Sequence, residues 1–352
     1  MAVDTITIPA IVGKQGDRTF YQLILTNKDL MTRFSTSKCE PTSVKSQREL
    51  DPKHAAKITD YIVSNPQDYV LGTLTYAVDR PCTFVPTDSR SNTGVLRIPA
   101  DSTIHSLDGQ HRRQGLKDAV IKYSNISDDS SAVMLYVESD SKKRRQMFSD
   151  FNSTPKKVSA TLNVQFNTRN PYTRAANDIV AGHHLLEGVV EMTRPSVSSG
   201  SSKFWTLGGI CDALQRIQPE YRKARSMTPD AYDKILDRAH VLFDVLSGAR
   251  LELAEAQYGT LDVPTARTEN ILFSSVTLRA IAGALGEIYK INGGVLSDDQ
   301  VEDITNRLFD VDFSPNNPAW SECGFLAPGT STPNSRLQEI KAGTNLLVKL
   351  LS

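Results

Sequence analysis

The sequence has little of what marks membrane, secreted or zinc-binding proteins. Its four cysteines are widely scattered and form no CxxC pair, so neither a zinc site nor a disulfide framework is predicted. No run approaches the roughly 18 apolar residues that a membrane-spanning helix needs. The first residues lack the basic stretch and apolar run of a secretory signal. We therefore expect a cytoplasmic protein without membrane association.

The chain also lacks an excess of charge of either sign, because 40 lysines and arginines balance 40 aspartates and glutamates. A monomer that binds DNA non-specifically usually has a basic balance. Any nucleic-acid surface must therefore be a local patch or arise by oligomerisation. The clearest basic run is Lys142-Lys143-Arg144-Arg145, followed by Lys156 and Lys157. We expect these residues to contact DNA, and the alternative is a solvated helix start with solvent-facing lysines.

The first half of the chain alternates patterns of strands and helices. At 352 residues, with 39% hydrophobic and 23% charged residues, the chain can bury one large core or two ordinary domains. Asp51-Pro52 is a good helix start, and Asn65-Pro66 ends that helix. Strands are predicted at 6–12, 19–25, 71–78, 94–99, 103–107 and 132–137, a helix at 142–152, and a loop at 81–93. This order favours a mixed α/β domain.

The second half has helical spacing of its apolar residues almost throughout. Helices are predicted at 172–190, 205–218, 229–257, 268–291, 297–309 and 335–350, with loops at 195–202, 261–265 and 314–333. We therefore expect an α+β protein with an α/β domain over residues 1–168 and an all-α domain over residues 169–352.

The stretch Asp108-Gly109-Gln110-His111-Arg112, followed by Arg113, carries the strongest chemical signal. It lies between the strand pattern at 103–107 and a helix pattern at 115–123. A glycine at a strand-to-helix turn lets the backbone approach a ligand, and the N–H groups that begin the helix attract anions. The histidine and two arginines add donors suited to phosphate oxygens. The pattern indicates phosphate recognition; the alternative is a basic helix start on a solvated surface.

This stretch matches letter for letter the signature of the DGQHR-domain family, whose best-known members are the DndB proteins of bacterial DNA phosphorothioation systems. Other segments resemble the family as well, so that the likeness covers roughly residues 5–170. They are Gln47-Arg48-Glu49-Leu50, the stretch 69–74, Phe148-Ser149-Asp150-Phe151-Asn152 and Lys156-Lys157-Val158.

The resemblance implies a fold related to ParB proteins and sulfiredoxins, and a nucleotide site at this turn. In ParB-like proteins a Gly-Glu-Arg-Arg turn binds a nucleoside triphosphate, and in sulfiredoxins a Gly-Cys-His-Arg turn binds ATP and carries the reactive cysteine. Gln110 stands where those families have Glu or Cys. Glutamine is neither a nucleophile nor a general base, so sulfinic-acid reduction is excluded and hydrolysis that depends on a carboxylate is put in doubt. Its amide can still orient a water or a sugar hydroxyl.

Within this turn, His111, Arg112 and Arg113 are expected to contact phosphates, with Gly109 permitting a close backbone approach. Asp108 either caps the helix or holds a basic side chain in place. Arg112 is the first candidate, because a buried guanidinium without an anionic partner would be costly.

The resemblance also implies roles for two residues outside the turn. Asn152 would reach Mg²⁺ or a phosphate of bound ATP or CTP, as oxygen ligands suit that ion; the alternative is a left-handed helix C-cap. Arg48 would point into the ligand pocket or else lie on the surface.

Three other features favour ordinary structural roles. For the pair His183-His184, a satisfied or exposed pair is expected rather than a metal site. Trp205 and Trp320 could stack on bases, but core positions are the stronger expectation.

The family resemblance implies a regulator that binds the promoter of its own modification cluster and represses it. DNA and other proteins of the modification system would be its partners, and a homo-oligomer would double a small footprint. The alternative is a nucleotide-dependent ATPase subunit of a DNA-modification pathway such as 7-deazaguanine insertion. A ParB-like nuclease is disfavoured, since the sequence has no cluster of metal-binding carboxylates.

Overall fold

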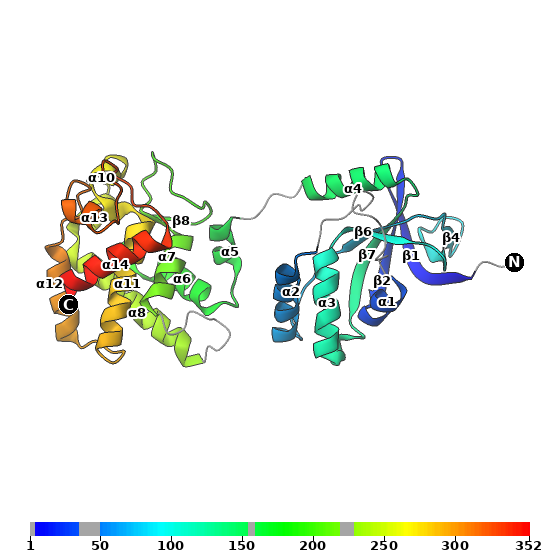
Figure 1. Cartoon of the computed structure of the whole chain (residues 1–352), viewed down its shortest axis with the longest axis horizontal. Coiled ribbons are helices and arrows are strands. Elements are labelled where there is room, and N and C mark those ends of the chain that lie inside the picture. Colours follow the sequence, from blue (N-terminus) through cyan, green and yellow to red (C-terminus); the bar gives the residue numbers. More distant parts are fainter. Residues whose placement is uncertain (1–3, 35–49, 154–158, 219–228) are drawn as a thin grey trace. The chain divides into compact units, whose positions relative to one another are not determined.

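The computed structural model describes residues 4–34, 50–153, 159–218 and 229–352 (Figure 1). The chain divides into two compact units, Met1–Lys156 and Lys157–Ser352. The sequence places the boundary between residues 168 and 169. As expected for an α+β protein, the first unit is built on a mixed sheet and the second is mainly helical.

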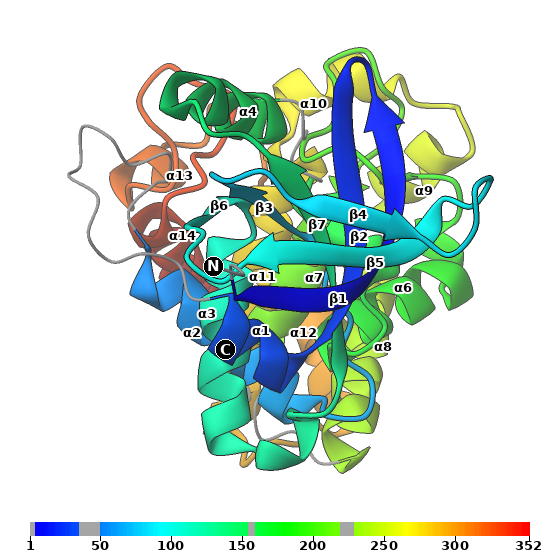
Figure 2. The same ribbon diagram turned by 90° about the vertical axis from the view of Figure 1, so that its right-hand side faces the viewer.

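The first unit contains a seven-stranded sheet with the order β4-β5-β1-β2-β7-β3-β6. Figure 2 shows β5 lying between β4 and β1, as in this order. Neighbouring strands are antiparallel except for β3 and β7, which are parallel. The strands are β1 (Thr5–Gln15), β2 (Arg18–Thr26), β3 (Leu74–Val78), β4 (Thr83–Pro86), β5 (Thr93–Pro99), β6 (Ile104–Asp108) and β7 (Ser130–Val137).

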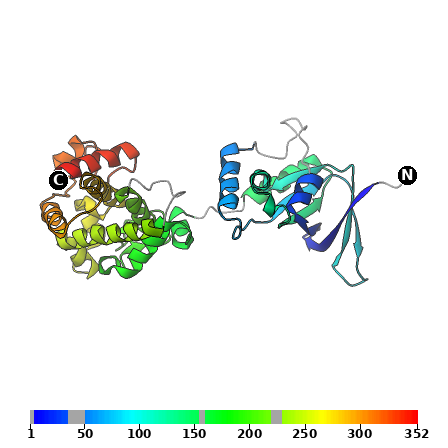
Figure 3. The same ribbon diagram turned by 90° about the horizontal axis from the view of Figure 1, so that it is seen from below.

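In the described residues of the first unit, four α-helices accompany this sheet: α1 (Asn27–Arg33), α2 (Pro52–Ser64), α3 (Gln110–Lys122) and α4 (Ser141–Ser153). Helices α2 and α3 pack against each other (Figures 1 and 3). Their contact requires a small residue, since a Cβ added at Gly115 would lie 2.7 Å from Ile58 Cβ. This packing fixes the direction in which α3 leaves the sheet, and therefore the position of its first turn.

The predicted start of α2 is confirmed. Asp51 is the N-cap, and its Oδ1 accepts hydrogen bonds from the backbone N–H of Lys53 at 2.9 Å and of His54 at 3.4 Å. Pro52 occupies the first helical position, where its missing N–H costs nothing. The helix ends at Asn65, just before Pro66, as expected.

Replacing Asp51 by alanine is expected to lower the free energy of unfolding of the first unit by about 1 kcal/mol, because two N–H groups lose their acceptor. Asp51→Asn is the matched control and should unfold like the wild type, since asparagine caps equally well. Denaturant titration of both variants measures the effect. An equal loss in the two variants would show that the negative charge matters rather than the cap.

The second unit contains ten α-helices in its described residues, and β8 (Val190–Glu191) pairs with β9 (Trp205–Thr206) in a short parallel ladder. Its core gathers most of the large aromatic residues of this half. The helices are α5 (Ala160–Phe166), α6 (Pro171–Gly182), α7 (Leu207–Ile217), α8 (Pro229–Ala249), α9 (Leu251–Gln257), α10 (Val263–Glu269), α11 (Ser275–Ile291), α12 (Asp298–Phe309), α13 (Pro318–Glu322) and α14 (Leu337–Leu351).

Several predicted boundaries in this half are wrong. The helix predicted at 229–257 is broken at Arg250, whose Nη1 donates to the carbonyl oxygens of Leu308 and Val311 at 3.1 and 2.8 Å. The helix predicted at 172–190 already ends at Gly182. The helix predicted from residue 268 starts at Ser275. The helix α10 begins within the loop predicted at 261–265, and α13 lies within the loop predicted at 314–333.

Both tryptophans lie in the core of the second unit, as expected. Trp205 is fully buried and donates its Nε1–H to the carbonyl oxygen of Leu272 at 3.1 Å. Trp320 is also buried and donates to the carbonyl oxygen of Asp312 at 2.9 Å. Among the described helices, none has the length and apolar character needed to cross a membrane.

Candidate functional site

The DGQHR turn, residues 108–112, connects β6 to α3. Gly109 has a φ of 90°, which side chains other than glycine rarely adopt. There is no room for a side chain either, because a Cβ added there would lie 2.5 Å from Leu74 Cδ2. Glycine is therefore required at this position both by the backbone conformation and by the neighbouring strand.

Arg112 is held between a carboxylate and a glycine. Its Nη2 donates to Asp108 Oδ2 at 2.5 Å, and the two side chains are 27% and 40% exposed. Its Nη1 lies where a side chain at Gly72 would be, 2.5 Å from an added Cβ. Asp108 thus holds a basic side chain, and the capping alternative is wrong, because no side chain caps α3. Because Asp108 already supplies an anionic partner, Arg112 does not need an anion from outside the chain to offset its charge.

The residues on either side of Arg112 contact the rest of the first unit. Nε2 of His111 accepts a hydrogen bond from the backbone N–H of Asp51 at 3.0 Å. Nη2 of Arg113 donates to the carbonyl oxygen of Phe34 at 2.8 Å, at the end of α1. His111 and Arg113 therefore tie the turn to the residues that precede α2 and follow α1.

A cavity of about 260 Å³ lies beside the turn and brings several of the predicted residues together. Asp108, Gly109, Gln110, His111 and Arg112 line it, together with His54 from α2 and with Phe148 and Asn152 from α4. Arg113 is not among the described residues that line it. This volume lies just below the range of about 300–1,000 Å³ that is usual for small-molecule pockets.

Asn152 lies inside α4 and its side chain lines this cavity. Its Nδ2 donates to the carbonyl oxygen of Phe148 at 2.7 Å. The left-handed C-cap alternative is wrong, since no residue other than glycine has a positive φ in the described part of the chain. The described residues also contain no group of three or more histidine, cysteine, aspartate or glutamate side chains that could hold a metal. Mg²⁺ at Asn152 would therefore depend on ligand phosphates for its other ligands.

The basic run at the start of α4 divides into one buried residue and three exposed ones. Arg144 is only 6% exposed, and its Nη1 donates to the carbonyl oxygens of Glu138 and Ser139 at 3.0 and 2.7 Å. Lys142, Lys143 and Arg145 are exposed. Arg144 thus anchors the helix to the residues that follow β7 and is not available to contact DNA. Of the four residues in the basic run, only Lys142, Lys143 and Arg145 face the solvent. Arg48, Lys156 and Lys157 fall outside the described residues.

Sequence reasoning missed two residues near the turn. Gly72 was predicted to lie in a strand. Nothing in the sequence around it indicates that it contacts Arg112. Tyr76 of β3 is fully buried. Burial raises the pKa of its phenol to about 12, opposed by the positive charges of Arg113 and Arg112. The phenol is therefore a neutral group close to the two arginines.

The histidine pair in the second unit is satisfied within the chain, as expected. His183 is buried, and its Nε2 lies 3.1 Å from Asp244 Oδ1. Burial lowers its pKa, while the hydrogen bond to Asp244 opposes that shift. His184 stacks on His183 with ring centroids 4.6 Å apart, and its Nε2 lies 3.0 Å from Ser247 Oγ.

Comparison with known proteins gives one clear match. A family model, DndB, described as DNA-sulfur modification-associated, matches residues 8–351. No curated protein and no solved structure matches the chain. The match extends beyond the residues that carry the sequence resemblance and includes nearly all of the second unit.

Proposed function

The chain belongs to the DndB family of proteins associated with DNA-sulfur modification, and on this premise we propose that it is a DNA-binding regulator. It represses the promoter of a DNA phosphorothioation gene cluster, and it senses a nucleotide or phosphate ligand at the DGQHR turn. The observation that carries this proposal is the cavity in which the turn and the end of α4 meet.

The cavity has the donors that a phosphate needs. Arg112 uses Nη2 for Asp108, and among the described residues Nη1 and Nε make no hydrogen bond. A guanidinium offers five N–H groups, so Arg112 can hold Asp108 and a phosphate oxygen at once. The start of α3 adds the positive end of a helix that no side chain caps. Gln110 orients a ligand hydroxyl or water without acting as a base.

Helix α4 connects this cavity to a basic surface. Its first turns expose Lys142, Lys143 and Arg145, and its last turns place Phe148 and Asn152 in the cavity. A DNA backbone that follows the start of α4 therefore lies close to the ligand. Base-edge contacts give sequence specificity, whereas these cations supply phosphate contacts. Two copies of the chain double the small basic footprint, as is usual for repressors of promoters.

The test of DNA binding uses Lys143→Ala. Each phosphate contact that is lost weakens binding about uniformly across sequences and lowers the salt slope by about 1. We expect this change for Lys143→Ala in fluorescence anisotropy with the DNA upstream of its own operon, measured across a salt series. Lys14→Ala, at an exposed lysine near the end of β1, is the matched control and should leave the slope unchanged. An unchanged slope in Lys143→Ala would remove α4 from the DNA surface.

A second candidate function is that of a nucleotide-dependent ATPase subunit in a DNA-modification pathway such as 7-deazaguanine insertion. The observation that favours it is that Asn152 and Arg112 line one cavity, where a triphosphate with Mg²⁺ would contact both. Against it, Gln110 supplies no carboxylate and Asp108 is engaged by Arg112. Turnover of ATP or CTP that disappears in Asn152→Ala would favour the ATPase; DNA binding without turnover favours the regulator.

A further inference from the structure

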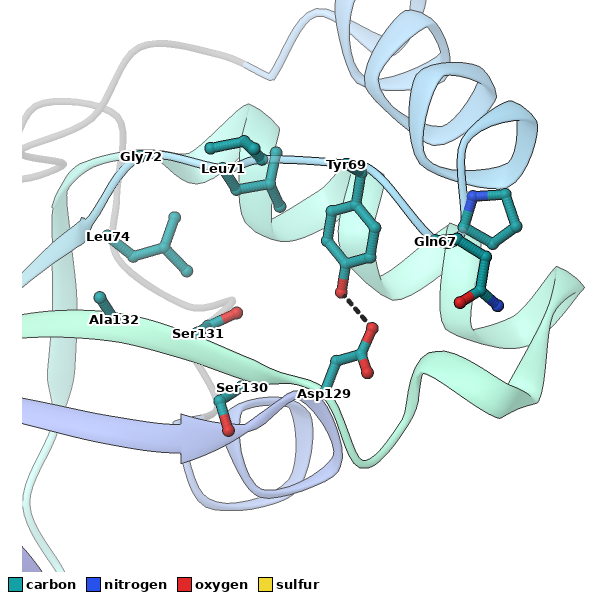
Figure 4. A pocket seen from close by; sticks show the side chains of 11 residues that line it. Gln67, Tyr69, Leu71, Gly72, Leu74, Asp129, Ser130, Ser131 and Ala132 are labelled. Carbon is teal, nitrogen blue, oxygen red and sulfur yellow. Dashed lines mark hydrogen bonds between the residues drawn. The ribbon is translucent and has the colours of Figure 1, made fainter.

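A larger cavity, about 470 Å³ in volume, lies between β7 and the stretch of chain that leads into β3 (Figure 4). One wall comes from Tyr69, Leu71 and Gly72, and the other from Asp129, Ser130 and Ser131. Neither the sequence motifs nor the family match assigns a role to these residues.

The cavity exists because two parallel strands diverge. The ladder between β3 and β7 begins with the pair Leu74 and Val133, and residues 70–73 before it belong to no strand. Residues 130–132 of β7 remain paired with β2 on their other side. The backbone edge of β7 therefore faces the cavity across from residues 70–73, where a planar ligand with donors and acceptors fits between the two chains.

The cavity lies at the same edge of the sheet as the DGQHR turn. Thr75, at the start of β3, pairs with Asp108 at the end of antiparallel β6. The beginnings of β3 and β7 and the end of β6 therefore share one edge. Neighbouring strands are about 4.8 Å apart, so the cavity and the DGQHR turn are separated by roughly the width of one or two strands. Gly72 also belongs to both places, since it lines the cavity and abuts Arg112 Nη1.

A hydrogen-bond network holds the wall of the cavity in place. Asn27 is fully buried; its Nδ2 donates to the carbonyl oxygen of Ile126 at 2.8 Å and to Tyr69 Oη at 3.3 Å. Ser131 Oγ donates to Asn27 Oδ1 at 2.8 Å. Tyr69 Oη donates to Asp129 Oδ2 at 2.7 Å, as drawn in Figure 4. Asp129 and Ser131 are thus positioned before any ligand arrives.

The lining indicates which chemical group the cavity takes. The described residues that line it include no lysine, arginine or histidine, so this is no anion site. It offers the carboxylate of Asp129, the hydroxyls of Ser130 and Ser131, and apolar faces from Leu71 and Ala132. A carboxylate accepts hydrogen bonds from the amino group of a base, as from N4 of cytosine. Apolar faces on either side suit a flat ring.

We propose that this cavity is a base subsite, which binds a nucleobase that carries an exocyclic amino group, with Asp129 as the acceptor. The base belongs to the nucleotide whose phosphates contact Arg112, so in this form the inference rests on the proposed function. Uracil has O4 in place of the amino group of cytosine, and hypoxanthine lacks the amino groups of adenine and guanine. Both bind more weakly because the amino donor to the carboxylate is lost.

The test compares the affinities of matched ligands by calorimetry: CTP with UTP, and ATP and GTP with ITP. For the favoured base, losing one hydrogen bond to a charged acceptor weakens binding by about tenfold to a hundredfold. Asp129→Asn should abolish this preference and still bind triphosphate, because it keeps an acceptor for Tyr69 but loses the carboxylate. Asp128→Asn, which makes the same change in the neighbouring residue, is the control and should keep the preference.

The corresponding nucleosides, which have no phosphate, separate the subsite from the phosphate site. By saturation-transfer NMR, the favoured nucleoside should bind both the wild type and Arg112→Ala, and its binding should be lost in Asp129→Asn. If triphosphates bind but every base binds equally, the base subsite is wrong and the phosphate site stands. If triphosphates fail to bind while the nucleoside binds through Asp129, the phosphate site is wrong and the base subsite stands. Absence of binding by both overturns both.

Discussion

Arg112→Ala is expected to lower the affinity for nucleoside triphosphate by at least about thirtyfold while the chain stays folded. The substitution removes the guanidinium that faces the cavity and leaves the Asp108 carboxylate without its partner. Truncating one member of such a charged pair at a binding site costs about 2–5 kcal/mol of binding free energy, and a negative charge left in the cavity also repels phosphate. Isothermal titration calorimetry with ATP and CTP measures the loss.

Two further variants test whether the position of the Arg112 guanidinium matters and whether its neighbour Arg113 has the same role. Gly72→Ala keeps Arg112 but places a methyl group where Nη1 lies, so the flexible side chain must move. We expect weaker triphosphate binding with little loss of stability. Arg113→Ala removes the hydrogen bond to Phe34 and should lower stability without a comparable loss of affinity. The opposite pattern, with Arg113 controlling affinity and Arg112 without effect, would contradict the assignment of the cavity.

Gly109→Ala is expected to lower the free energy of unfolding of the first unit by about 2–5 kcal/mol. A positive φ costs a residue with a side chain about 1–2 kcal/mol, and forcing a methyl group against a packed neighbour costs about 1–3 kcal/mol. The neighbour here is Leu74, which is buried in the sheet. Denaturant unfolding measures the change, and triphosphate binding should fall with it because the turn is displaced.

Gly16→Ala is the matched control for this substitution. Gly16 has a φ of 57° in the β1–β2 turn, but an added Cβ meets no atom within 4 Å. Gly16→Ala is therefore destabilised by the positive φ alone, without a steric clash, and should leave triphosphate binding unchanged. Equal stability losses at Gly16 and Gly109 would mean that the contact with Leu74 does not restrict the turn.

Local patterns predicted the parts of the fold that local interactions stabilise. The strands predicted at 6–12 and 19–25 are confirmed, and they pair with each other as the antiparallel strands β1 and β2. The start of α2 follows from the cap at Asp51 and from Pro52. The strand β4 was missed, since Thr83–Pro86 lies in a segment rich in turn residues and ends in proline, which an edge strand tolerates.

The features that the sequence did not predict depend on partners that are distant along the chain. The break at Arg250 is stabilised by carbonyl groups after α12, and nothing near Arg250 indicates them. Residues 71–73 were predicted to belong to a strand, yet β3 begins only at Leu74, and Leu71 and Gly72 line a cavity. In the turn, the sequence predicted which residues lie together but not where each side chain points. Only the structure shows that Arg112 faces the cavity while Arg113 contacts Phe34.

The most direct test of a ligand-sensing regulator is the affinity for its own upstream DNA, measured with and without nucleoside triphosphate. We expect the protein to bind its upstream DNA more tightly than scrambled DNA, with an affinity that falls steeply with salt. The affinity should shift by at least about fivefold when triphosphate is added, as is usual for coupling between two sites. The shift should disappear in Arg112→Ala. Equal affinity for upstream and scrambled DNA, unchanged by triphosphate, would show that the protein is not a ligand-sensing regulator of this DNA.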